Sequence, residues 1–302
     1  MKRKTILSII LILVAATGWG VIGVFTRPLS GAGLNAIQIT FIRSLIVAVS
    51  MGIFLLCKDR KLFRIKLKDG WVFLGTGLIS IVFFNVCYFL TIERTTLATA
   101  SVLLYTAPCF VILLSAIFFK EKITIQKVAA LVLAFFGCML ASGFAGGEIT
   151  VWVLLTGIGA GLGYASYSIF GKVALKKYNT FTVVFYTFAV ATVGLLPFVQ
   201  IPHIVTVFVG DVGTAFIGLG LGMISTVMPY LFYTGGLQYI EAGKASVMAF
   251  AEPMVATIAG IVIFREPLYW TNAIGILMIF LAILLLNIPL KTIFRKGRQT
   301  TE

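Results

Sequence analysis

Two charged residues stand inside long apolar stretches of this sequence, and they carry the clearest chemical meaning. Arg43 lies about a turn and a half into one predicted helix and Glu252 about two turns into another. A charge in hydrocarbon costs free energy unless it faces a partner or a wet cavity. Arg43 either anchors its helix by reaching toward the interface or contacts an anionic substrate group. Glu252 either stabilises a helix break as a neutral hydrogen-bonded group, contacts a substrate amine, or couples transport to protons by taking one up and releasing it.

Aromatic and polar side chains recur three or four residues apart on several predicted helices, which puts them on common faces. Tyrosine combines an apolar ring with a hydroxyl, so such faces are typical of a lined cavity. An interfacial aromatic belt is the alternative, and it fits Tyr239 and Trp270 better than residues deep inside a span. The substrate-binding residues that we predict are Trp19, Asn85, Tyr88, Tyr164, Tyr167, Ser168, Tyr230, Tyr233 and Glu252.

Catalytic interpretations find little support. The only histidine, His203, lies in a predicted loop, with no acid or cysteine cluster to complete a site. The glycine runs at 157–163 and 218–222 lack the preceding strand and the following Lys-Ser/Thr of a phosphate loop, and they are more typical of closely packed membrane helices. We therefore predict that the protein is not an enzyme and has no catalytic residue, no metal site and no cofactor.

The composition assigns these residues to membrane-spanning helices. Hydrophobic residues make up 60% of the 302 positions and charged residues 11%, which is far outside the range of a soluble domain. A spanning helix needs about 20 apolar residues, so ten helices leave no room for a soluble domain. The predicted spans are Thr5–Phe25, Ile37–Cys57, Trp71–Ile92, Leu97–Phe119, Ile125–Gly143, Val151–Gly171, Phe181–Gln200, Val212–Gly235, Ala245–Phe264 and Trp270–Pro289.

The net charge of +14 comes from short basic runs between these spans rather than from a nucleic-acid-binding surface. With the amino terminus in the cytoplasm, 20 of the 24 Lys and Arg residues fall inside and three fall outside, namely Arg27, Arg94 and Arg265. This split follows the positive-inside rule and predicts an even number of spans with both termini cytoplasmic. No nucleic-acid partner is expected.

The two halves of the chain are alike at a constant shift of 145 residues. Ala100-Ser101-Val102 falls on Ala245-Ser246-Val247, and Phe119-Lys120-Glu121 on Phe264-Arg265-Glu266. Arg27 likewise falls on Lys172. Five helices per half is an odd number, so the second copy enters the membrane from the opposite side and the repeats are inverted. We predict one repeat over 1–144, a second over 145–290 and a basic cytoplasmic tail over 291–302.

Short motifs in a fixed order make the chain similar to a known family. These are Gly-Trp-Gly in the first span, Phe-Ile-Arg in the second, Thr-Ala-Pro then Phe-Lys-Glu in the fourth, and Glu-Pro then Phe-Arg-Glu-Pro in the ninth. Together they resemble EamA-type members of the drug/metabolite transporter superfamily, over essentially the whole chain. The resemblance implies ten helices, cytoplasmic termini and transport of metabolites, often outward.

The fold class expected is therefore all-α integral membrane, with ten transmembrane helices in two inverted five-helix repeats. The function expected is secondary transport of a small organic metabolite, such as an amino acid or related compound, with export across the bacterial inner (cell) membrane by alternating access. The partners would be that metabolite, the lipid bilayer and, if Glu252 couples transport, protons. The rival functions are an integral-membrane enzyme acting on lipid, which lacks its cluster of carboxylates or histidines, and a channel or scaffold.

Overall fold

The computed structural model describes residues 2–143 and 148–288, and all of its regular structure there is helical. The predicted basic tail over 291–302 lies outside the described residues. The elements of the first half are α1 (Lys2–Gly20), α2 (Ile22–Gly31), α3 (Ala36–Lys58), α4 (Gly70–Leu74), α5 (Phe84–Ile92), α6 (Leu97–Leu104), α7 (Ala107–Phe119) and α8 (Ile125–Ala141). Those of the second half are α9 (Val151–Ala174), α10 (Thr180–Leu195), α11 (Ile201–Gly210), α12 (Val212–Gly222), α13 (Met228–Leu237), α14 (Ala242–Met248), α15 (Ala251–Phe264) and α16 (Trp270–Asn287).

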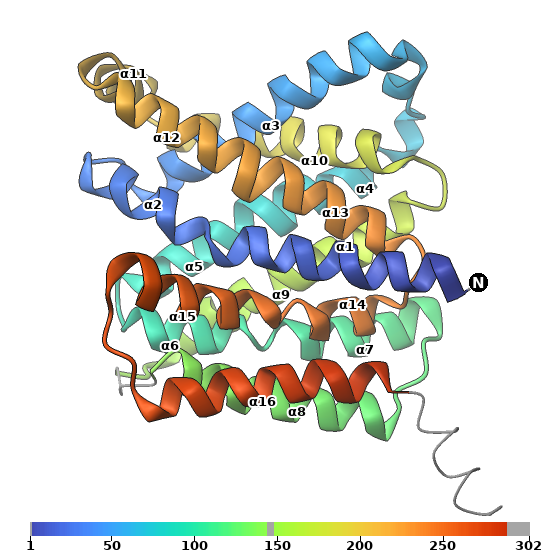
Figure 1. Ribbon diagram of the computed structural model, residues 1–302. Helices are drawn as coiled ribbons and strands as arrows, with labels where there is room; N and C mark the ends of the chain where they lie inside the picture. Colours follow the sequence, from blue (N-terminus) through green and yellow to red (C-terminus); the bar gives the residue numbers. More distant parts are fainter. Residues whose placement is uncertain (1, 144–147, 289–302) are drawn as a thin grey trace, which may run out of the picture.

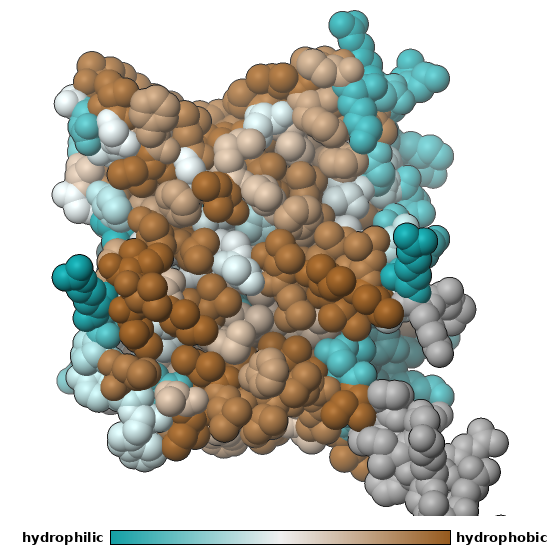
Figure 2. All heavy atoms as spheres, in the orientation of Figure 1, coloured by the Kyte–Doolittle hydropathy of each residue, from teal (hydrophilic) through white to brown (hydrophobic). Residues whose placement is uncertain are grey.

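Several of these short elements join end to end into longer spans. Among the described residues, nine helical runs are long and apolar enough to cross a membrane. The helix α8 has 17 residues and packs along α16 at one edge of the bundle (Figure 1), so it completes the ten spans that the sequence predicts. Figure 2 shows a broad hydrophobic band between two more hydrophilic edges, as a bilayer-embedded protein requires.

Polar residues at the span ends explain where several helices begin. Asn35 forms a capping box with Gln38 at the start of α3, and Asn179 accepts from the Thr182 amide at the start of α10. Thr124 and Thr150 cap α8 and α9 in the same way. Each side chain accepts a hydrogen bond from an otherwise unpaired amide, and so fixes the first turn.

The fourth and ninth spans are broken at equivalent places. The helix α6 ends at Leu104 and α7 begins at Ala107, while α14 ends at Met248 and α15 begins at Ala251. Pro108 and Pro253 follow these breaks, since proline has no amide hydrogen to continue the helix. The carbonyl of Ala249, which Pro253 has no amide hydrogen to pair with, accepts the Glu252 amide at 2.9 Å instead.

The third and eighth spans contain π-helical turns that the sequence did not predict. These turns cover Gly75–Phe83 between α4 and α5, and Met223–Val227 between α12 and α13. A shift of 145 residues superposes the two segments, so the irregularity belongs to both repeats. Such turns are frequent at functional sites, and here each directly precedes the helix that carries candidate site residues.

Glycines allow close helix packing, as predicted for the run at 157–163. A Cβ built on Gly163 of α9 would lie 3.0 Å from the Cα of Phe84 on α5, and one on Gly137 of α8 would lie 2.9 Å from the carbonyl oxygen of Gly275 on α16. The helix backbones therefore touch where a side chain would separate them. The predicted loop around His203 differs from the structure, which forms the short helix α11 there with Pro202 in its first turn.

Candidate functional site

The helical bundle has two opposite end faces. The terminal face is the end at which α1 begins and α16 ends, and the distal face is the opposite end, at which α2 ends and α15 meets the turn to α16 (Figure 1). Each span runs from one face to the other.

A cavity of about 490 Å³ lies between the two halves of the chain. Its walls come from α1, α2, α3, α5, α6, α9, α13 and α15, and it extends from Glu252 to Arg27, Ser30 and Phe264 at the distal face. The cavity is large enough for a small organic molecule. Seven of the residues singled out in the sequence line it: Trp19, Arg43, Asn85, Tyr88, Tyr164, Tyr230 and Glu252.

Arg43 and Glu252, which both line this cavity, are not paired with each other. Arg43 is 8% exposed, and its Nε has no hydrogen-bond partner in the part of the chain that the structure describes. None of the ion pairs between described residues includes Arg43 or Glu252. Glu252 instead accepts a hydrogen bond from the Tyr164 hydroxyl at 3.1 Å. A buried guanidinium with an unused donor is costly.

The charges are also placed asymmetrically between the repeats. The 145-residue shift puts Phe188 at the position of Arg43 and Ala107 at the position of Glu252. Phe188 is fully buried and its ring packs edge-on against Tyr230, with centroids 4.7 Å apart. Both halves thus contribute to the cavity, whereas Arg43 and Glu252 have no charged equivalent in the other repeat.

Aromatic rings form the wall between these charges. The Trp19 ring lies 5.2 Å from that of Tyr230 and 6.5 Å from that of Tyr164, both in edge-on contacts. The hydroxyl oxygens of Tyr88 and Ser101 are hydrogen-bonded at 3.1 Å, which joins α5 to α6. Such rings give a rigid apolar surface with hydroxyl groups at its edge.

The other three predicted residues do not line the cavity in this conformation. Tyr167 is hydrogen-bonded to Thr234 at 2.6 Å, and Ser168 to Tyr233 at 2.7 Å. All of these groups are buried between α9 and α13. The Tyr233 ring also packs against Trp19. They therefore lie one turn beyond the cavity, on the side of the terminal face, and hold α9 against α13 there.

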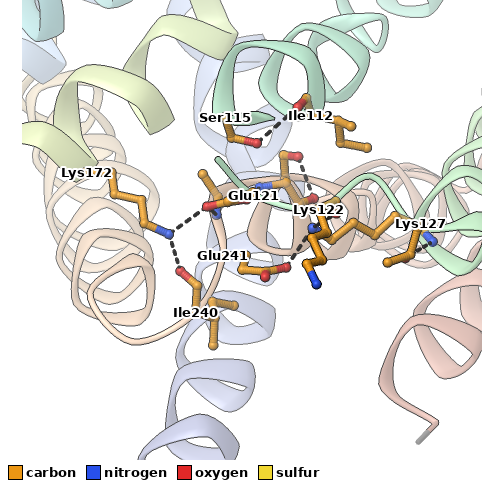
Figure 3. A network of polar contacts seen from close by, with 12 residues as sticks. Ile112, Ser115, Glu121, Lys122, Lys127, Lys172, Ile240 and Glu241 are labelled. Carbon is orange, nitrogen blue, oxygen red and sulfur yellow. Dashed lines mark hydrogen bonds and ion pairs between the residues drawn. The ribbon is translucent and has the colours of Figure 1, made fainter. Parts of the chain in front are cut away.

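Between these residues and the terminal face, a network of ion pairs joins the halves (Figure 3). Glu121, in the turn after α7, pairs with Lys172 of α9 at 2.9 Å and accepts the amides of Ala242 and Gly243 at 2.8 and 3.2 Å. Lys172 also donates to the carbonyl of Ile240 at 2.7 Å. Burial acts to raise the pKa of Glu121, but these hydrogen bonds and the Lys172 charge outweigh it and hold the pKa below its ordinary value. Glu121 is therefore ionised at neutral pH.

A second ion pair strengthens the same closure. Lys127 of α8 pairs with Glu241, just before α14, at 2.6 Å. Lys127 is almost fully buried there and also donates to the carbonyl of Lys122 at 2.9 Å. The terminal face is thus closed in this conformation, and the cavity reaches the distal face alone.

Some cavity residues were missed by the sequence analysis. Thr40 donates to Asn85 at 3.2 Å and lies three residues before Arg43, so helical periodicity could have identified it. Ser101 and Tyr105 also line the cavity. The break before Pro108 was a signal for Tyr105, because residues beside a helix break often face a cavity.

Comparisons with known proteins agree with this architecture. The model of the EamA-like transporter family matches residues 6–143 and again residues 151–288. A protein of Archaeoglobus fulgidus described as an uncharacterized transporter is 29% identical over 276 residues, which cover 91% of this chain and 94% of that protein. The pseudopaline exporter CntI of Pseudomonas aeruginosa is 27% identical over 240 residues, covering 78% and 80% of the two chains. A crystal structure at 15% identity has the same fold, with a TM-score of 0.78 over 93% of this chain and 96% of that one.

Proposed function

Since this chain belongs to the EamA-like transporter family and is a multi-pass membrane transporter, we propose that it is a secondary carrier that exports an amino acid or a related small metabolite by alternating access. The family match and the names of the relatives point to transport and away from enzymatic activity. The Pseudomonas relative is named as an exporter, which supports the outward direction. The inverted repeats supply two equivalent halves that can close either face in turn.

The observation that carries the proposed substrate is a cation and an anion, Arg43 and Glu252, that line one cavity without an ion pair to any described residue. Arg43 would receive the carboxylate of the substrate, because a guanidinium binds a carboxylate through two parallel hydrogen bonds. Glu252 would receive the ammonium group, with Tyr164 orienting its carboxylate. The rings of Trp19 and Tyr230 would contact the apolar part of the substrate. A zwitterion satisfies both buried charges, whereas a simple acid or amine leaves one of them unpaired.

The same proposal fixes an orientation. The terminal face carries most of the basic residues and would lie in the cytoplasm of the cell, with both termini there. The distal face would then lie outside the cytoplasmic membrane, and the conformation described above is open outward. Tyr167, Ser168 and Tyr233 would enter the binding site when the terminal face opens.

Counterflow into proteoliposomes tests the substrate class. Vesicles loaded with unlabelled compound are given a trace of labelled amino acid, and the exchange is compared with that of the matching decarboxylated amine and the matching deaminated acid. We expect exchange of the zwitterion only. Arg43→Gln and Glu252→Gln should each reduce its exchange by roughly tenfold or more, the effect of one lost charged hydrogen bond.

Two exposed residues of the distal face serve as matched controls. Glu93 and Arg94 have the same charges but do not line the cavity, so Glu93→Gln and Arg94→Gln should exchange at the normal rate. Equal transport of the amine or the acid would exclude a zwitterion site. If Glu252→Gln keeps its substrate affinity and loses only the pH dependence of transport, Glu252 couples protons and does not bind the substrate amine.

A further inference from the structure

Two ion pairs at opposite faces of the bundle are related by the repeat. Arg27 pairs with Glu266 at 2.7 Å at the distal face, and Lys172 pairs with Glu121 at 2.9 Å at the terminal face. The 145-residue shift carries Arg27 onto Lys172 and Glu121 onto Glu266. Each pair therefore joins a cation of one half to an acid of the other, and the two pairs are the same contact made at the two ends.

The surroundings of the two acids repeat as well. Lys120 and Arg265, which precede them, both have a left-handed backbone with φ of 55°, although neither is glycine. The amide of Glu121 bonds the carbonyl of Ser115, and the amide of Glu266 bonds the equivalent carbonyl of Gly260. A left-handed conformation is costly for such residues and persists only where the structure around it requires it. Both turns are therefore built to hold an acid in one defined place.

The two cations, Arg27 and Lys172, also make equivalent contacts with aromatic rings. Arg27 lies over the ring of Phe264 at 4.0 Å, and Lys172 lies near the equivalent ring of Phe119 at 5.7 Å. A cation above an aromatic face gains electrostatic attraction and is held in position. The positions of all three groups, cation, acid and ring, are thus preserved between the two ends.

The two ends differ in burial and in backbone contacts. The side chains of Lys172 and Glu121 are 20% and 7% exposed, whereas those of Arg27 and Glu266 are 51% and 45% exposed. Only the terminal acid reaches the next helix, where it accepts the amides of Ala242 and Gly243. By the repeat, these amides correspond to those of Leu97 and Ala98 at the start of α6, and the Ile240 carbonyl corresponds to that of Thr95. Residues Leu97 and Arg27 instead line the open mouth of the cavity.

We propose that Glu121 with Lys172 and Glu266 with Arg27 are the two alternate latches of the transport cycle. When the distal face closes, Glu266 accepts the amides of Leu97 and Ala98, Arg27 donates to the Thr95 carbonyl, and the terminal latch separates. The proposal rests on the alternating access of the proposed function, and adds which groups close each face.

This exchange keeps the two conformations close in free energy. A buried carboxylate needs a full set of charged and amide donors, because desolvation otherwise costs more than the ion pair gains. In each conformation one of the two acids has this full set of donors. The other acid stays in a solvent-exposed ion pair, which contributes little to stability. Because the repeat provides the same set of donors at both ends, neither conformation is favoured strongly by its latch.

Distances between paired spin labels measure which face is closed. Arg94 and Leu268 are exposed positions on either side of the distal latch, and the repeat gives Tyr239 and Ile123, also exposed, on either side of the terminal latch. In the full-length protein, Glu121→Gln should lengthen the Tyr239–Ile123 distance and shorten the Arg94–Leu268 distance. Glu266→Gln should do the opposite. Each change should alter the ratio of the two populations by roughly tenfold, as expected for a lost charged hydrogen bond.

Additional variants separate the latch from a general loss of folding. The double variant with both glutamines should return toward the wild-type ratio, since it weakens both conformations equally. Exchange of the terminal charges, Glu121→Lys with Lys172→Glu, should rescue only partly, because a lysine cannot accept the amides of Ala242 and Gly243. A melting temperature in detergent near that of the wild type would show that each variant is folded.

The outcomes also distinguish the latch from the transport proposal. If the labels report two conformations but the single variants leave their ratio unchanged or shift it the same way, the latch is wrong and alternating access remains. If no substrate is exchanged in vesicles while the variants shift the ratio as stated, the substrate proposal fails and the latch remains. A single conformation in every sample would overturn the latch.

Discussion

At the scale of single residues, the contact between Tyr164 and Glu252 can be tested without removing a charge. Tyr164→Phe keeps the ring that packs against Trp19 and deletes the hydroxyl that donates to the carboxylate. We expect substrate binding to weaken by several-fold, since one hydrogen bond to a charged group is lost. Tyr164→Ala should weaken it further, because the ring is lost as well. Quenching of tryptophan fluorescence by the substrate measures both changes.

A tyrosine outside the cavity gives the control for this pair of variants. Tyr186 donates to the carbonyl of Phe63 near the terminal face and does not line the cavity. Tyr186→Phe should therefore bind substrate normally. Unchanged binding in Tyr164→Ala would move the site away from α9.

At this scale the sequence predicted helix faces that line the cavity, but not how far along each helix the cavity extends. Arg43 and Glu252 could be identified because charges inside apolar stretches are rare and costly. Tyr164, Tyr167 and Ser168 do share a face of α9, yet only Tyr164 lines the cavity. Periodicity assigns a side of a helix, and one turn along it is about 5.4 Å. Whether that turn is open or closed depends on the conformation of the whole bundle.

At the scale of elements, the packing of α9 makes a sharp prediction. A Cβ at Gly163 would lie 3.0 Å from the backbone of Phe84, whereas one at Gly171 of the same helix would lie 3.7 Å from the flexible end of Leu237. Gly163→Ala must therefore push α9 away from α5, at a cost of about 1–3 kcal/mol. Gly171→Ala should be nearly neutral. Melting temperatures in detergent compare the two, and equal melting would show that α9 and α5 are not in backbone contact.

The sequence predicted the positions of the spans better than it predicted the π-helical turns within them. The breaks before Pro108 and Pro253 follow from a missing amide, so they could be located from one residue each. The π-helical turns have no such marker. In the first of them Thr76 is bonded to Thr187 on α10 at 2.7 Å, and in the second Thr226 donates to the carbonyl of Leu221, five residues earlier, at 2.9 Å. The first of these contacts depends on a neighbouring helix, and neither follows from a residue type that marks a π-helical turn in the sequence.

At the scale of the whole molecule, the inverted repeat explains why equivalent ion pairs occur at both faces of the bundle, although they differ in burial. Residues related by the repeat form a buried network at the terminal face and an exposed ion pair at the distal face. The constant shift of 145 residues was visible in the sequence, because equivalent turns need equivalent residues. The asymmetry was not visible, since it is a property of one conformation and both ends have nearly the same sequence.

The distribution of Lys and Arg residues predicts the orientation of the chain in the membrane. Basic residues are retained on the cytoplasmic side, so the terminal face should lie inside. Arg64 and Lys176 are exposed at that face, and Arg94 is exposed at the distal face. Each is replaced by cysteine in a chain without its four native cysteines, one of which, Cys57, is itself exposed. An impermeant maleimide should label Arg94→Cys in intact cells.

The other two positions should react only after the membrane is made permeable. Arg94 is preferable to its neighbour Thr95, whose hydroxyl oxygen is buried. The cysteine-free chain gives the background, and its growth or transport phenotype shows that it still folds. Labelling of Arg64→Cys and Arg94→Cys from the same side would contradict an odd number of spans between them, and with it the inverted relation of the repeats. Labelling of Arg64→Cys and Lys176→Cys alone in intact cells would keep the fold and reverse the orientation, so that the cavity of this conformation would open to the cytoplasm.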